Sequence, residues 1–391
     1  MRHLLLSLAL VIALAGAAGA ATLAVPGGYA TIGAALAAAE AGDTVLVACG
    51  IYQESDLALV SGVKLLSETG GAYCVTIDAQ GAGPVFTGAN LGTSTKVQGF
   101  TITGGAATAG GGMQLSNSSA RFENCLFTGN AATGAEGGAL RASGGAPYFT
   151  LCTFADNSAA NQGGAAYFTG ASPSFYGCTF RGNEAGGNGG ALWLGSSPAS
   201  VTDCQFYEND SEGRGGGICL ADGSDATLTL VTLFGNYAAT HGGALCCIGS
   251  SPTINSCTLV ENSTLGSGAG LYAGWTSAPV VGQTIIAFST IGEGVGVDAG
   301  TSSAAFTCSD IAGNRDGDWT PPIDSQASQN GNLSVDPQFC GTESHGNYFL
   351  QSDSPCAPDN NTCGVLIGSH QVDCGIIATE ETTWSAVKSL Y

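Results

Sequence analysis

A phrase of six residues recurs along this chain at a nearly constant interval. It begins as Cys125-Leu-Phe-Thr-Gly-Asn130 and returns with its first residue at positions 152, 178, 204, 231 and 257. The intervals are therefore 27, 26, 26, 27 and 26 residues. A fixed period of this length is typical of solenoids, in which each repeat packs only on its neighbours. The period predicts a long stacked array instead of two globular domains.

Each repeat alternates large apolar residues with small or polar ones, as a half-buried strand does. One such run is Pro173–Phe180, and a second run, Gly189–Leu194, follows it after a glycine-rich turn. Neither run has the 3.6-residue period of a helix. We therefore expect an all-β fold, a right-handed parallel β-helix of about ten coils with three short strands in each coil.

Stacking places equivalent residues of successive coils directly above one another, at a strand spacing of about 4.8 Å. This register predicts three inward apolar columns, which begin at Phe122, Phe127 and Leu140. The second of them continues through Phe154, Phe180, Phe206, Leu233 and Leu259. Asparagine tolerates left-handed backbone, so the last residue of the phrase predicts an amide ladder at a turn. The ladder comprises Asn130, Asn157, Asn183, Asn209, Asn236 and Asn262.

The N-terminal residues predict export. Arg2 and His3 precede an apolar run from Leu4 to Leu14, and small residues up to Ala20 follow it. This is the layout of a secretory signal peptide, which we assign to residues 1–20. We expect a secreted or cell-surface protein, with outer-membrane association as one form of attachment. No later apolar run reaches about 18 residues, so no transmembrane segment is expected after signal cleavage.

The charge balance argues against two classes of partner. The chain has 9 Lys+Arg against 30 Asp+Glu, a formal net charge of -21. A nucleic-acid binder needs a basic stripe to neutralise phosphates, and docking on anionic lipid also needs basic residues. We therefore expect no nucleic acid among the partners, and no binding to an anionic membrane surface.

The chain has 15 cysteines, and export favours disulfides among some of them. The repeat cysteines, such as Cys152, alternate in phase with the inward phenylalanines, which favours a role as small apolar filler. Cys219 and Cys246 share an outward column in adjacent coils, which favours a disulfide between them. A further group is expected to staple a loop-rich C-terminal cap, in pairs that spacing cannot decide. This group comprises Cys340, Cys356, Cys363 and Cys374.

The ends of the array are expected to be capped. The Ala-rich stretch from Tyr29 to Ala41 predicts a short amphipathic helix over the first coil, because an open solenoid end exposes unpaired backbone. We place the β-helix with this cap at residues 21–315, the cysteine-containing C-terminal cap at 316–375 and a tail at 376–391.

Several segments resemble known β-helix proteins. Ala30-Thr-Ile32, Gly42-Asp-Thr-Val-Leu-Val47, Gly50–Glu54 and Gly99-Phe-Thr-Ile102 are similar to the N-terminal region of secreted proteins of the pectate-lyase-like superfamily. The Phe-x-x-Asn units followed by Gly-Gly-Ala-Leu resemble the repeat of polymorphic outer-membrane proteins. The resemblance implies the β-helix fold over roughly residues 25–315. It implies no single activity, because the superfamily holds lyases, hydrolases, epimerases and adhesins.

One outward column favours glycan contact. Arg141, Tyr167 and Trp193 occupy the same outward position in three successive coils. Flat aromatic rings can stack on sugar rings, and the Arg141 guanidinium offers a fork of hydrogen-bond donors. The alternative is the ordinary preference of strands for aromatic residues, or a strip that a loop covers.

Catalysis would need converging acids. The resemblance to pectate lyases implies a calcium cluster of carboxylates with a basic residue. The nearest constellation is Asp156, Arg181 and Glu208, on successive coils. Asp156 and Glu208 would lie about 10 Å apart, wide for an acid–base pair, so a solvated surface is the favoured interpretation. His241 and His370 have no acidic neighbour in a matching column.

One segment resembles a calcium-binding loop. Asn314, Asp316 and Asp318 alternate as calcium ligands do, but the later glutamate and flanking helices of a full loop are missing. A turn that leaves the β-helix is the favoured interpretation. Apart from calcium at this loop, no cofactor is expected.

Together these features predict an exported β-helix that binds polysaccharide, cell-surface glycans or other surface partners without catalysis. One alternative is a polysaccharide lyase or glycoside hydrolase that acts on acidic polysaccharide. The other is a structural envelope protein that binds nothing. The oligomeric state does not follow from the sequence.

Overall fold

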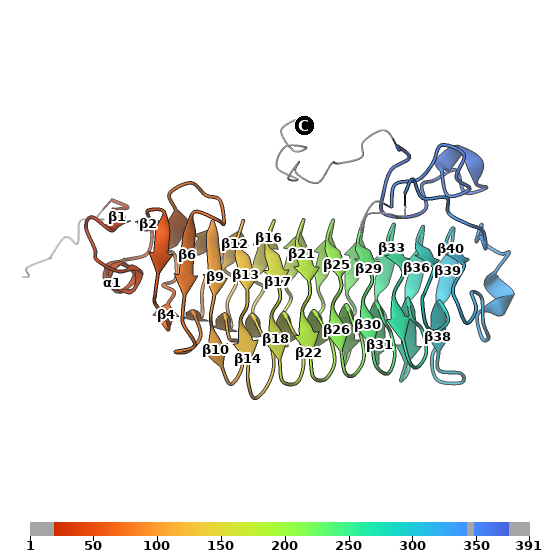
Figure 1. The fold of residues 1–391 in the computed structure, drawn as a ribbon, viewed down its shortest axis with the longest axis horizontal. Coiled ribbons are helices and arrows are strands. Elements are labelled where there is room, and N and C mark those ends of the chain that lie inside the picture. Colours follow the sequence, from red (N-terminus) through yellow and green to blue (C-terminus); the bar gives the residue numbers. More distant parts are fainter. Residues whose placement is uncertain (1–18, 342–347, 375–391) are drawn as a thin grey trace, which may run out of the picture.

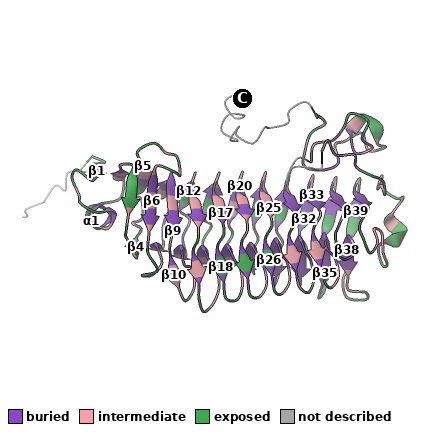
Figure 2. Ribbon diagram, viewed as in Figure 1, coloured by how far each residue is buried: buried purple, intermediate pink, exposed green. Residues whose placement is uncertain are grey.

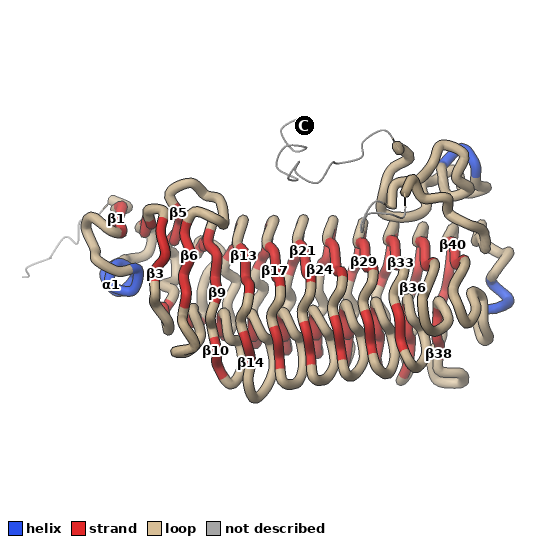
Figure 3. The backbone as a smooth tube through the Cα atoms, in the orientation of Figure 1, coloured by secondary structure: helices blue, strands red, loops and turns tan. Residues whose placement is uncertain are grey.

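A computed structural model of the chain describes residues 19–341 and 348–374 (Figure 1). The predicted C-terminal tail lies outside these residues, as does the predicted signal peptide except for its last two positions. The described chain forms a parallel β-helix of about 11 turns, which confirms the predicted fold class. Short strands joined by tight turns make up nearly all of it, and the helices lie at the ends (Figure 3).

Three long parallel sheets run along the helix axis. Within the described residues, sheet A has 12 strands, sheet B has 11 and sheet C has 10. Sheet A consists of β1 (Thr22–Val25), β2 (Thr44–Val47), β5 (Lys64–Ser67), β8 (Lys96–Gln98), β12 (Arg121–Glu123), β16 (Tyr148–Thr150), β20 (Ser174–Tyr176), β24 (Ser200–Thr202), β28 (Thr227–Thr229), β32 (Thr253–Asn255), β36 (Val280–Gly282) and β39 (Ala305–Thr307).

Sheet B follows sheet A in each coil, and sheet C comes later in the same coil. Sheet B consists of β3 (Gly50–Tyr52), β6 (Val75–Asp78), β9 (Phe100–Thr103), β13 (Leu126–Thr128), β17 (Thr153–Ala155), β21 (Thr179–Arg181), β25 (Gln205–Tyr207), β29 (Thr232–Phe234), β33 (Thr258–Val260), β37 (Ile285–Ala287) and β40 (Asp310–Ala312). Sheet C consists of β4 (Leu57–Ala58), β7 (Phe86–Ala89), β11 (Met113–Ser116), β15 (Leu140–Ser143), β19 (Ala166–Thr169), β23 (Leu192–Gly195), β27 (Ile218–Ala221), β31 (Leu245–Ile248), β35 (Leu271–Gly274) and β38 (Val295–Val297).

A fourth, narrow sheet adds to the three predicted strands of each coil. Sheet D has seven strands in the described residues, and each strand is two residues long. They are β10 (Ala106–Ala107), β14 (Ala131–Ala132), β18 (Ser158–Ala159), β22 (Glu184–Ala185), β26 (Asp210–Ser211), β30 (Tyr237–Ala238) and β34 (Ser263–Thr264). Two residues are too few to show the apolar alternation that marks a strand, so the pattern could not reveal this sheet.

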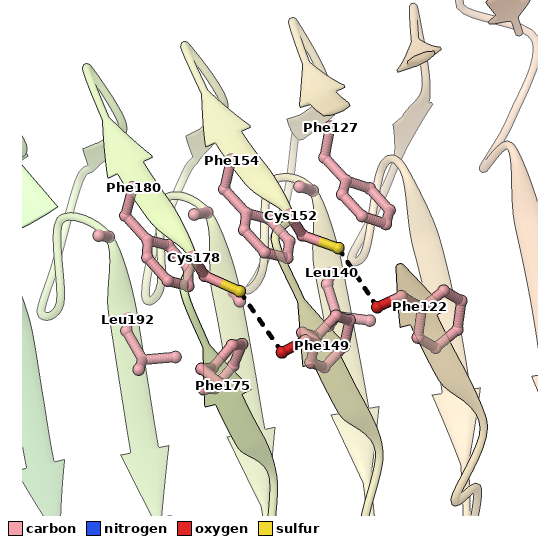
Figure 4. Close-up of a cluster of buried hydrophobic side chains, with 14 of the residues drawn as sticks. Phe122, Phe127, Leu140, Phe149, Cys152, Phe154, Phe175, Cys178, Phe180 and Leu192 are labelled. Atoms are coloured by element: carbon pink, nitrogen blue, oxygen red, sulfur yellow. Dashed lines mark hydrogen bonds between the residues drawn. The ribbon is translucent and has the colours of Figure 1, made fainter. Parts of the chain in front are cut away.

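The predicted apolar columns form the interior (Figure 2). Phe127, Phe154 and Phe180 stack with their ring centroids 4.8 and 4.7 Å apart and their planes within 4° (Figure 4). The column that begins at Phe122 stacks in the same way, with a centroid distance of 5.1 Å to Phe149. Cys152 is buried among these rings, and its thiol donates to the carbonyl of Phe122 at 3.4 Å.

The asparagine ladder is confirmed at the turn between sheets B and D. The side-chain amide of Asn183 donates to Oδ1 of Asn209 at 2.8 Å and to the carbonyl of Phe154 at 3.0 Å. Its own Oδ1 accepts from both the backbone N–H and the side-chain amide of Asn157. The amide-to-amide bond repeats from Asn130 to Asn236, and Asn262 donates instead to the carbonyls of Leu233 and Val260, so each buried amide is satisfied.

A short helix caps the N-terminal end, as predicted. Helix α1 (Ile32–Ala38) begins after Thr31, whose side chain accepts the N–H of Ala34. Glu54 accepts the N–H groups of Ile32 and Gly33, both at 2.8 Å, which places a carboxylate at the positive end of the helix. The helix buries its apolar side over the first coil. No helix in the described residues has the length and apolar character needed to cross a bilayer.

The C-terminal cap folds back over the outer face of sheet B (Figure 1). Phe339, Tyr348 and Ile367 of the cap bury Phe234 and Ile285 of sheet B in a second apolar cluster. Two single-turn helices belong to the C-terminal region, Asp324–Gln326 and Pro358–Asn360. The cap is thus loop-rich, and it adheres along the side of the last coils instead of only closing their end.

The cysteines differ in part from expectation. Cys340 pairs with Cys374, whereas Cys363 pairs with Cys308 of the β-helix, and a disulfide also joins Cys49 to Cys74. Cys356 of the expected cap staples is a free, buried thiol.

The expected disulfide between Cys219 and Cys246 is also wrong for this structure, in which both are free, buried thiols. They are strand partners. Strand spacing alone does not exclude such a bond, because Cys49 and Cys74 of adjacent coils are joined at a Cα distance of 4.7 Å.

Candidate functional site

Asp156 and Arg181, two of the three residues expected near a catalytic centre, form an open ion pair on the surface. Arg181 Nη1 lies 3.5 Å from Asp156 Oδ2, and their side chains are 43% and 59% exposed. Tyr207 is the strand partner of Arg181 in sheet B and lies close to Asp156 and Glu208. Burial is the main cause that raises the pKa of its phenol. An exposed ion pair of this kind contributes little free energy and leaves both charges in solvent. The geometry agrees with the solvated surface favoured from the sequence.

The loop expected to bind calcium uses its carboxylates to close a turn. Asp318 Oδ1 accepts from the backbone and side-chain N–H groups of Asn314, at 2.8 and 2.9 Å. Asp316 accepts the N–H of Gly292, and Asn314 donates to the carbonyl of Ile286, as a ladder asparagine does. In the part of the chain that the structure describes, no three His, Cys, Asp or Glu residues are grouped to hold a metal ion.

The predicted glycan column is present, but its rings face one another. Tyr167 and Trp193 stack at a centroid distance of 4.4 Å with planes within 3°, and the Arg141 guanidinium lies 5.9 Å from the Tyr167 ring centre. Arg141 also pairs with Glu136 at 3.6 Å. Trp193 is only 8% exposed. The expected stacking of sugars on these ring faces is therefore wrong, because the protein itself covers them.

Further along the same column the outer face of sheet C is closed. Cys219 and Cys246 are fully buried, and Tyr272 is 7% exposed, in an apolar cluster that includes Trp193. This agrees with the alternative interpretation of a covered strip. The polar residues that lie over this end of the column come from the turns that lead into sheet C.

These polar residues form a cluster that the sequence analysis missed. Arg214, His241 and Ser267 precede strands β27, β31 and β35 and pair as neighbours in parallel. The His241 ring stacks on Tyr272 at 4.4 Å, and the Arg214 guanidinium lies 5.1 Å from the ring centre of Trp275. The Tyr272 hydroxyl donates to Asp298 Oδ1 at 2.7 Å. We name Arg214, His241, Tyr272, Trp275 and Asp298 the sheet C platform.

The side chains of His241 and Tyr272 in the platform are uncharged hydrogen-bonding groups. His241 Nδ1 accepts the N–H of Ser267 at 3.1 Å, so the neutral ring carries its proton on Nε2 and offers a donor there. Burial and the nearby Arg214 lower the pKa of His241. Burial and the bond to Asp298 raise the pKa of the Tyr272 phenol. Both side chains are therefore uncharged at neutral pH.

Trp275 is an unusual residue at its position. It follows strand β35 with φ 54° and is 58% exposed. The residue after the sheet C strand has a left-handed backbone in each of the six preceding coils too. Those positions carry glycine, asparagine or aspartate, which tolerate this conformation, and one serine; they are Asn117, Gly144, Gly170, Ser196, Asp222 and Gly249.

A separate hollow lies over sheet D. Its volume is about 310 Å³, and Glu184, Asp210 and Glu212 line it. Glu184 and Asp210 are strand partners on β22 and β26. Burial, and then the two neighbouring carboxylates, raise the pKa of Asp210. The hollow collects negative charge, and it contains neither aromatic rings nor hydrogen-bond donors from basic side chains.

Comparison with known proteins identifies the family. The sequence matches the family described as Right handed beta helix region over residues 87–239 and 137–311. No curated protein matches the chain. The solved structure of pectate lyase Pel9A is similar with a TM-score of 0.54 at 12% identity, over 91% of this chain and 97% of that chain. At that identity the likeness shows the fold alone. Because the two family matches span more than half of the 391 residues, the chain belongs to the right-handed β-helix family.

Proposed function

We propose that this protein is an exported β-helix that binds glycans, without catalysis, at the turns that flank the outer face of sheet C. The observation that carries the proposal is the sheet C platform. It joins an exposed indole to donors on Arg214 and His241 and to the Asp298 carboxylate. An apolar ring beside a few oriented polar groups is what a carbohydrate site needs, because sugars present both C–H faces and hydroxyls.

The protonation states favour binding over catalysis at this platform. A lyase needs a base near neutral pH, and a glycosidase needs two carboxyl groups at a defined separation. The His241 nitrogen that could act as a base already accepts a backbone N–H, and the Tyr272 phenol is made less acidic by its surroundings. One oxygen of the Asp298 carboxylate, Oδ1, accepts the Tyr272 hydroxyl.

The alternative function is that of a polysaccharide lyase or glycoside hydrolase. The fold likeness to a pectate lyase favours it, since this fold can carry such chemistry. An enzyme of either kind would release unsaturated or reducing ends from acidic polysaccharides. The same purified protein, incubated with a polysaccharide panel, would reveal this activity by absorbance or by a reducing-end assay.

The binding proposal is tested by Trp275→Ala. Removal of an exposed aromatic anchor is expected to weaken glycan binding about tenfold or more, measured on a glycan array and by titration calorimetry. Tyr176→Ala is the matched control, because Tyr176 is 44% exposed on the outer face of sheet A, away from the platform. The control should bind like the unmodified protein. Equal binding by all three proteins would contradict the proposal, and no binding by any would favour the structural envelope alternative.

A further inference from the structure

We infer that the sheet C platform takes a neutral polysaccharide, and that Trp275 is presented to it at a cost in backbone stability. This inference rests on the proposed function and adds the class of ligand. It is carried by the charges around the platform, by its hydrogen-bonding groups, and by the backbone of the Trp275 turn.

The charges around the platform disfavour ionised sugars. Arg214 is the cation, Asp298 and Glu293 are the carboxylates within electrostatic reach of His241, and His241 itself is held neutral. Two negative charges thus face one positive charge, on a chain whose formal net charge is -21. A uronate would enter a negative field. A cationic sugar would be repelled by the positive guanidinium of Arg214, which lies over the indole.

The platform suits hydroxyl groups. Arg214 presents a planar fork of donors, and the neutral His241 ring presents one donor at Nε2. The Asp298 carboxylate accepts the Tyr272 hydroxyl on Oδ1 and has capacity for further donors. A sugar hydroxyl both donates and accepts, so it can use both kinds of group without bringing a charge.

The backbone at Trp275 also favours a binding role for its indole. A bulky residue is disfavoured in the left-handed region, and Thr276 beside Trp275 is also left-handed, with φ 69°. Leu151, Leu230 and Phe288 are also left-handed at other turns, so it is this backbone together with the 58% exposure of the indole that favours a binding role.

The ligand class is tested with the full chain by titration calorimetry. The probes are a soluble β-glucan and a galactomannan as neutral polysaccharides, and polygalacturonate and alginate as anionic ones. Each titration is run at about 50 mM and about 500 mM NaCl, across which charge interactions are strongly screened. We expect binding of a neutral probe with an affinity that changes less than about twofold between the two salts, and no binding of the anionic probes at low salt.

The outcomes separate the two proposals. If only an anionic probe binds, with an affinity that falls as salt rises and is lost in Trp275→Ala, the inference is overturned and the proposed function stands. If no probe binds and a glycan array is also negative, the proposed function fails together with the inference.

A second pair of variants tests the backbone cost. Trp275→Gly relieves the left-handed strain and is expected to raise the Tm by about 1–3 °C, while it abolishes binding. Trp275→Ala also removes the indole but keeps a Cβ atom in the left-handed region, so it should lose binding without this rise. A Tm for Trp275→Gly at or below that of Trp275→Ala would overturn the claim that the turn is strained.

Discussion

Asn183 shows how single residues hold the repeat together. The side chain bonds to the coil on each side of it and to the carbonyl of Phe154, and it is fully buried. Both the asparagine and the phenylalanine ladders could be predicted from the sequence, because stacking at one fixed spacing forces the same residue types into the same slots. The residues that recur most visibly are therefore structural.

Replacing one ladder residue should destabilise the β-helix strongly. Asn183→Ala leaves the backbone N–H and the side-chain amide of Asn157 without their acceptor, and the carbonyl of Phe154 without its donor. At about 1–3 kcal/mol for each buried unpaired group, we expect a loss of at least about 3 kcal/mol in the free energy of unfolding, measured by urea denaturation. Asn255→Ala is the control, since Asn255 is half-buried on sheet A and its amide donates to the hydroxyl of the adjacent Ser256. Similar losses in both variants would contradict this role for the ladder.

Other properties of single residues did not follow from the pattern. The period predicts that Trp193 lies on the outer face, but it does not predict how closely Tyr167 covers the Trp193 ring. Spacing aligns Cys219 with Cys246 and Cys49 with Cys74 alike, but only the second pair is bonded, so alignment alone does not predict a disulfide. Burial on an outer face depends on which turns and caps lie over it, and those turns vary from coil to coil.

At the scale of elements, the C-terminal cap is the least predictable part. The outward column of sheet B changes from Thr128, Ala155 and Arg181 in earlier coils to Phe234 and Val260 in later ones. This change is a sequence signal for a covered face, and the cap does cover it. The cysteine count predicts a disulfide-linked cap. The spacing of the cysteines does not show that the cap folds back over sheet B, nor that Cys363 bonds to Cys308 of the β-helix.

A buried carboxyl under the cap predicts a dependence of stability on pH. Asp310 is fully buried, accepts the N–H of Val335 at 3.1 Å, and lies 3.5 Å from the Cys356 thiol. Burial raises the pKa of Asp310 to about 7, above the ordinary value of 3.8. Below pH 3.8 the carboxyl is protonated in both the folded and the unfolded chain. As the pH rises towards 7 the unfolded chain ionises first, so stability falls by about 1.4 kcal/mol per pH unit and then levels off.

Asp310→Asn should remove this contribution. We expect the variant to lose less stability than the unmodified protein between pH 5 and pH 8, measured as the Tm by calorimetry at each pH. The exposed Asp353 in the same cap provides the control, Asp353→Asn, which should keep the full pH dependence. An unchanged pH dependence in Asp310→Asn would show that the cap does not bury an uncharged carboxyl.

At the scale of the whole molecule, the platform is assembled from turns far apart in the chain. Its members run from Arg214 to Asp298, in successive coils. Asp298 and Glu293 act on His241 from two coils away. Comparing residues at the equivalent position of adjacent coils could therefore not detect them. The available signal is compositional, because Arg214 is one of only 9 basic residues and Trp275 one of only 4 tryptophans.

The central claim is that the ladders hold the fold and that ligand binding takes place at the sheet C platform. Hydrogen exchange of the full chain, with and without a saturating neutral polysaccharide, tests it directly. We expect added protection in peptides that span residues 267–276 and 293–298, with sheet A and the sheet D hollow unchanged. Protection confined to sheet A or to the hollow around Asp210 would contradict it.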